Sequence, residues 1–286
     1  MRFPSPGRCA MILAALATFH IVLPLLPLTL YVAAAVLQAR EVRVAPEARL
    51  TPLPALIALV AVVTHAWILF GAIETDQRLA LAITDSASLV GWVVGCTTLV
   101  AMVTMRTAAL PAVLLLFAGV LETGTGLLTG FREVHAPQWE ITAHIGLAAL
   151  AAGWLSIAAV VVLLISSLDS RLHARAPLGL LALLPPIETL ERVLFRAVGG
   201  GFVVLSFALL TGLFYVYDLF SQHLLHKTTL AIIAWLVFGV LLWGRYRYGW
   251  RGRKALRFTI AGFVILALAY FGSKFVLENL LGRHWG

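Results

Sequence analysis

Residues 222–275 read QHLLHKTTLAIIAWLVFGVLLWGRYRYGWRGRKALRFTIAGFVILALAYFGSKF, which places two apolar segments on either side of a short basic turn. Each segment approaches the length of about 20 residues that a helix needs to cross a bilayer. Six Lys or Arg residues lie between Arg245 and Arg257. Basic residues next to membrane spans favour the cytoplasmic side. The stretch therefore predicts a membrane hairpin with its turn on the inner side.

The composition of the rest of the chain predicts a membrane protein of several spans. Of its 286 residues, 61% are hydrophobic and 12% charged, and the mean hydropathy is +0.97. Because a bilayer leaves no backbone group without an internal partner, we expect an all-α bundle and no strands. One membrane domain, residues 1–286, is expected. Its predicted spans are 11–38, 53–73, 86–105, 108–121, 142–168, 197–217, 228–244 and 257–281.

Two further features of the chain concern its inner side. Pro185 and Pro186 precede apolar residues at helical spacing, which predicts an interfacial helix over 186–196. The helix is interpreted as a structural connector, with contact to a lipid or a partner as the alternative. Eight spans place most of the 21 Lys and Arg residues on the side of the basic turn. Both termini are therefore expected outside, and the charge of +8 is interpreted as a topology signal rather than as nucleic-acid binding.

The residues that could carry chemistry are the eight histidines, since neutral imidazole binds haem iron and is cheaper to bury than a charge. His144 begins span five and His226 precedes span seven, so both are predicted at one depth near the outer boundary. Two imidazoles at one depth could be the axial ligands of one haem. His65 lies deeper and would need a separate site, shared with His20 or with no other histidine. The alternative is that these histidines only anchor helices at the membrane interface.

Motifs for nucleotide use or hydrolysis do not occur in the chain. We find no Walker or dinucleotide glycine pattern, no HExxH and no GxSxG. Because no acid, base and nucleophile set converges either, we do not expect an enzyme.

Several short motifs resemble one known family. They are Lys227-Thr228, Trp235-Leu-Val-Phe, Gly249-Trp-Arg-Gly-Arg-Lys, Gly262-Phe263, Tyr270-Phe-Gly272, Thr64-His65-Ala66, Ser88-Leu89 with Trp92, and Thr142-Ala-His144. Over about residues 55–280 the chain resembles the cytochrome c assembly family, membrane proteins that handle haem during maturation of c-type cytochromes. It looks most like the small eight-span branch, the HemX-like and YpjD-like proteins. The resemblance implies a bacterial inner membrane, haem as ligand, and other cytochrome c assembly proteins as possible partners.

The chain also departs from the pattern of the full haem-handling members. Those members carry a WGxxWxWD loop, whereas residues 215–226 here are YVYDLFSQHLLH. Where they have a histidine late in span seven, this chain has Trp243. The resemblance therefore implies haem binding at His144 with His226, in c-type cytochrome assembly or haem homeostasis, more directly than haem delivery to an apocytochrome. The alternatives are a small-solute transporter or permease and a non-catalytic assembly factor without haem.

Overall fold

A computed structural model describes residues 25–44, 51–75, 78–80, 83–104, 109–123, 133–134, 139–215 and 222–272. Its long helices are α2 (Leu25–Val44), α3 (Leu53–Ile73), α4 (Ile83–Thr104), α5 (Leu110–Glu122), α6 (Trp139–His173), α7 (Ile187–Tyr215), α8 (Gln222–Tyr248) and α9 (Gly252–Ala267). A 3-10 turn covers Gly179–Leu183 and a π-helical turn, Leu268–Gly272, extends α9. The predicted helical bundle is confirmed.

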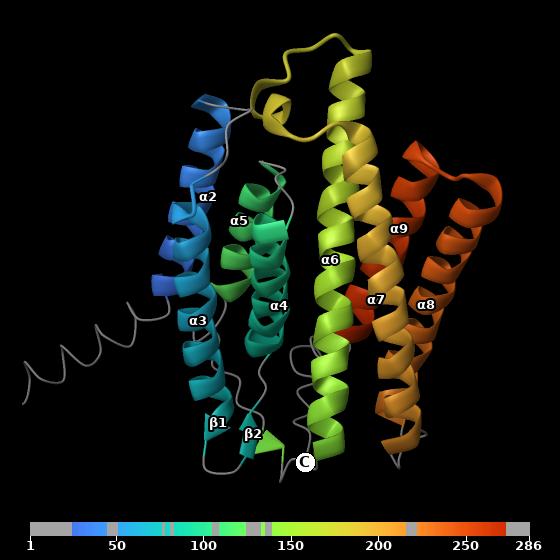
Figure 1. Cartoon of the computed structure of the whole chain (residues 1–286). Coiled ribbons are helices and arrows are strands. Elements are labelled where there is room, and N and C mark those ends of the chain that lie inside the picture. The colour runs from blue at the N-terminus through green and yellow to red at the C-terminus, as the bar shows by residue number, and fades with distance from the viewer. Residues whose placement is uncertain are drawn as a thin grey trace, which may run out of the picture.

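The helices stand side by side in two groups (Figure 1). Helices α2 to α5 contact one another, α6 to α9 do the same, and α4 against α6 is the main contact between the groups. We call these the N-terminal and C-terminal halves. Because successive helices run in opposite directions, the basic turn after α8 lies at the same end as the starts of α3, α5 and α7. This end, at the top of Figure 1, is called the arginine-rich end.

Among the described residues, six helices are long and apolar enough to cross a membrane: α2, α3, α4, α6, α7 and α8. Each predicted span from the second to the eighth overlaps a helix, and residues 273–281 of the eighth lie outside the described ranges. Helix α5 has 13 residues, a length of about 20 Å at 1.5 Å per residue, so it is shorter than the hydrocarbon core. The first span was predicted over 11–38, and its residues before Leu25 lie outside the described ranges. Pro27 lies in the first turn of α2, where proline is tolerated.

The expectation that the chain has no strands is wrong. Strands β1 (Glu74–Thr75), β2 (Arg78–Ala80) and β3 (Glu133–Val134) form an antiparallel sheet in the order β1-β2-β3. Leu79 is paired with Glu74 on one side and with Val134 on the other. All three strands lie in connections between helices, at the end opposite the arginine-rich end, where extended segments pair their backbone groups. Strand β3 thereby joins the connection between α5 and α6 to the α3–α4 connection.

The separate interfacial helix expected over 186–196 is instead the first part of α7, which continues to Tyr215. The Gly199–Gly201 run does not interrupt the helix. A Cβ on Gly200 would clash with the Trp154 ring, and one on Gly201 would come 2.8 Å from the Leu155 side chain. The glycines therefore allow close packing of α7 on α6.

The basic turn between α8 and α9 is a packed structure. Gly249 and Gly252 have φ of +64° and +53°, a region that favours glycine. Trp250 lies against Phe258, with 5.0 Å between ring centroids, and its carbonyl accepts a hydrogen bond from Arg245. These contacts give the GWRGR motif a structural role.

Glu191 of α7 joins the same turn to the neighbouring helix. Its carboxylate lies 3.3 Å from Arg251 and 3.9 Å from Arg245, and its side chain is only 12% exposed. The Arg245 guanidinium also stacks on the Phe195 ring at 4.4 Å. The projecting start of α7 is therefore held against α8 and α9.

Candidate functional site

His144 lies in the second turn of α6 and is half-buried against α7. Its Nδ1 atom lies 3.1 Å from Thr211 Oγ1. The Thr211 hydroxyl donates its own hydrogen to the Ala208 carbonyl at 3.0 Å. With the Thr211 hydrogen assigned to the Ala208 carbonyl, Nδ1 is the N–H donor to the Thr211 oxygen. The lone pair of His144 is then on Nε2.

Space around the His144 ring is provided by glycine. A Cβ on Gly212 would come 3.0 Å from the Cε1 atom of His144, so a larger residue would press on the ring. No residue of the described ranges hydrogen-bonds to Nε2. An imidazole that is oriented through one nitrogen and keeps a lone pair on the other is the arrangement found in metal-bound histidines.

The start of α8 lies close to His144. The Lys227 ammonium is 5.0 Å from the centroid of the Tyr270 ring and near enough to His144 for an electrostatic interaction. The backbone of His226 belongs to the first turn of α8, while its side chain lies outside the described residues. Lys227 thus places this end of α8 at the depth of His144, and the role of His226 as a ligand stays a prediction.

We call the residues at this depth, His144, Lys227 and Tyr270, the His144 layer. A hydrogen bond connects this layer to the N-terminal half. The Tyr270 side chain, in the turn that extends α9, is hydrogen-bonded to Ser86 of α4. This bond links the C-terminal half to α4, whose next polar residue, Ser88, contacts His65.

His65 is 1% exposed, at the centre of a polar cluster in the N-terminal half. Its Nε2 lies 2.8 Å from Ser88 Oγ on α4, and its Nδ1 lies 3.2 Å from the Tyr31 hydroxyl on α2. The two rings meet edge to face, with centroids 5.8 Å apart. An iron ligand needs a ring nitrogen with a free lone pair, and both nitrogens of His65 are engaged. This arrangement joins three helices, and the ligand role of His65 stays a prediction.

Residues that the sequence analysis did not select complete this cluster. Tyr31 is fully buried and Glu122, the last residue of α5, is 1% exposed. Glu122 is close enough to Tyr31 to interact with it electrostatically. The sequence signal that could have identified them is a polar or ionisable side chain within an apolar helix. Such a side chain is costly to bury in a membrane and therefore marks a position with a specific role.

The remaining histidines do not extend either site within the described ranges. His173, at the arginine-rich end, is 79% exposed and lies 3.3 Å from Asp169. His20, His135 and His284 lie outside the described residues. In the parts of the chain that the structure describes, no group of three or more His, Cys, Asp and Glu residues could hold a metal ion.

Comparison with known proteins gives a family for this chain. The family model described as "Cytochrome C assembly protein" matches residues 52–281. The chain belongs to the cytochrome c assembly protein family. This family member is 37% identical over 229 residues to "Inner membrane protein YpjD" of Escherichia coli (strain K12), a match covering 77% of this chain and 85% of the relative.

Shorter matches join this family member to proteins named "Cytochrome c biogenesis protein CcsA". The one from Microcystis aeruginosa (strain NIES-843 / IAM M-2473) is 34% identical over 98 residues, 34% of this chain and 28% of the relative. The one from Gloeothece citriformis (strain PCC 7424) is 31% identical over 121 residues, 42% and 35% of the two chains. No solved structure matches the chain.

The structure explains one departure from the family pattern. Trp243, at the position where the resemblance expects a histidine, is 66% exposed on α8. Its side chain lies on the outside of the bundle.

Proposed function

We propose that this family member binds haem through His144 and takes part in c-type cytochrome biogenesis in a bacterial inner membrane. The family supports the pathway, and the CcsA proteins it matches are named for cytochrome c biogenesis. The similarity to an inner membrane protein, and the apolar helices, support the location. Both termini are proposed to lie outside, because the described arginines gather at the opposite end of the bundle.

The observation that carries the proposal is the geometry of His144. Its Nδ1–H is bonded to Thr211, whose own hydrogen goes to the Ala208 carbonyl, and this orients Nε2 with its lone pair for iron. His144 would hold the haem iron through Nε2, and His226 is proposed as its second protein ligand; haem, when bound, would supply the iron. Lys227 contributes a positive charge in the same layer, which favours the carboxylates of a haem propionate. The role is binding, with no catalysis by the chain itself.

The proposal is tested on purified protein expressed with added haem. A Soret absorbance band is expected in the wild type, and His144→Ala and His226→Ala should each remove or shift it. His173→Ala is the matched control, since this exposed histidine lies at the arginine-rich end. A haem-free wild type, or spectra unchanged in both ligand variants, would contradict the proposal and favour an assembly factor that binds no haem.

A further inference from the structure

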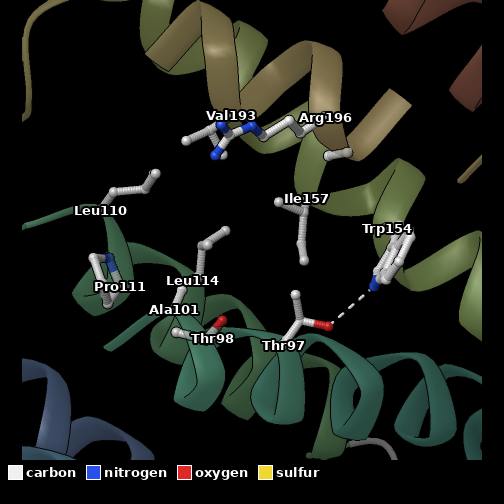
Figure 2. A pocket seen from close by; sticks show the side chains of 11 residues that line it. Thr97, Thr98, Ala101, Leu110, Pro111, Leu114, Trp154, Ile157, Val193 and Arg196 are labelled. Carbon is white, nitrogen blue, oxygen red and sulfur yellow. Dashed lines mark hydrogen bonds between the residues drawn. The ribbon is translucent and has the colours of Figure 1, made fainter. Parts of the chain in front are cut away.

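A cavity of about 210 Å³ lies between the two halves, away from His144. It is enclosed by α4 and α5 on one side and by α6 and α7 on the other (Figure 2). Buried Leu114 and Ile157 form its deep part, and exposed Arg196 lies at its edge. Arg196 and Leu110, the first residue of α5, line the same cavity, so its edge is at the level where α5 begins.

The polar groups of the cavity wall are already satisfied by the protein. The Thr98 hydroxyl donates to the Val94 carbonyl at 2.7 Å. Thr97 donates to the Val93 carbonyl, and its oxygen accepts the indole N–H of Trp154 at 3.2 Å, the bond drawn in Figure 2. Since no polar wall group seeks a partner, the cavity favours an apolar occupant over water.

Arg196 is the exception in this lining. Within the described ranges its guanidinium has no ion pair, hydrogen bond or ring contact, and no acidic residue lines the cavity. At the same end, Arg192 donates to Thr189 and Arg171 donates to the Pro177 carbonyl. An exposed cation without a partner, at the edge of an apolar cavity, fits an amphiphile with an anionic head.

We propose that this cavity binds one acyl chain of an anionic phospholipid from the bilayer, with the phosphate of its head group on Arg196. The volume is below the ~300–1,000 Å³ typical of sites for drug-sized ligands, so it suits a slender chain. The lining contains no His or Cys that could bind iron. This lipid site is separate from the His144 layer, and it does not depend on haem binding.

The test is native mass spectrometry of protein taken from nanodiscs that contain phosphatidylcholine and phosphatidylglycerol. One basic residue near an anionic lipid corresponds to a preference of about fivefold. The wild type should therefore retain phosphatidylglycerol over phosphatidylcholine by about that factor. Arg196→Gln should abolish the preference. Arg192→Gln, one helical turn away and outside the lining, is the matched control and should keep it.

A second pair of variants tests the cavity itself. Ala101→Phe fills it from α4 and should lower retention of both lipids, whereas Val103→Phe changes a 74% exposed position outside the lining and should not. Ala197→Val fills the cavity from α7 if Ala101→Phe does not fold. The proposal is overturned if the wild type shows no preference, if both arginine variants lose it equally, or if the folded filling variant retains lipid as the wild type does.

Discussion

Replacing Ser88 with alanine tests whether His65 is a hydrogen-bonded core residue. Ser88 is fully buried and its hydroxyl lies 2.8 Å from Nε2 of His65, itself 1% exposed. The substitution removes the oxygen and leaves the ring nitrogen without a partner inside the bundle. The expected effect is a loss of stability with no change in haem content.

The size of the effect follows from the burial and the distance. A buried polar group without its partner costs about 1–3 kcal/mol, and side-chain hydrogen bonds between membrane helices average about 0.6 and reach about 1.7 kcal/mol. Because this bond is short and both partners are buried, we expect Ser88→Ala to lower the free energy of unfolding by about 1.5 kcal/mol. The Tyr31 bond is longer, at 3.2 Å, and Tyr31→Phe should cost about 0.6 kcal/mol.

The assay is unfolding by sodium dodecyl sulfate in mixed micelles, combined with a double-mutant cycle of Ser88→Ala and His65→Leu. Removing both partners should cost less than the sum of the single variants. Ser167→Ala is the control, because this exposed serine bonds only to its own helix and should change stability by less than about 0.5 kcal/mol. A cycle with no coupling, or a Soret band altered in Ser88→Ala at unchanged stability, would refute the structural role of His65.

Three further predictions concern packing, the proposed haem site and the basic turn. Gly91→Ala should lower the free energy of unfolding by ~1–3 kcal/mol, because its Cβ would come 2.9 Å from a backbone carbonyl oxygen of α5. Gly146→Ala, with nothing within 4 Å, should be neutral or stabilising by up to ~1 kcal/mol, and equal effects of the two in detergent unfolding would argue against the close α4–α5 contact. Thr211→Val should weaken haem affinity by ~10–100-fold in a Soret titration, because it frees the ligand ring to turn. Thr259→Val is the control, because this buried hydroxyl lacks a hydrogen-bond partner among the described residues. It should leave haem affinity unchanged, and an equal loss of affinity would show that the effect of Thr211→Val is unspecific. Glu191→Gln should cost ~1 kcal/mol in low salt and less in high salt, measured by thermal unfolding, and a salt-independent loss would contradict its ion pairs.

Most of the fold was accessible from the sequence because lipid imposes simple requirements on length and polarity. A run such as 228–244 must be helical in a bilayer, and the arginines around Gly249 indicate which ends of the helices share a side. The GWRGR turn also carries part of the family resemblance. Two of its glycines, Gly249 and Gly252, have positive φ values. What local pattern did not predict was the small sheet and the continuation of residues 187–196 into α7, which depend on pairing and packing with distant segments.

The sequence by itself determined that the chain is a helical membrane protein with histidines near the ends of its helices. It ranked those histidines by depth alone. Only the tertiary structure decided what each ring nitrogen contacts, because the partners of His65 lie 34 and 23 residues away and that of His144 lies 67 residues away. Packing of α2, α3 and α4 engages both nitrogens of His65, whereas packing of α6 on α7 engages one nitrogen of His144 and leaves the other with its lone pair.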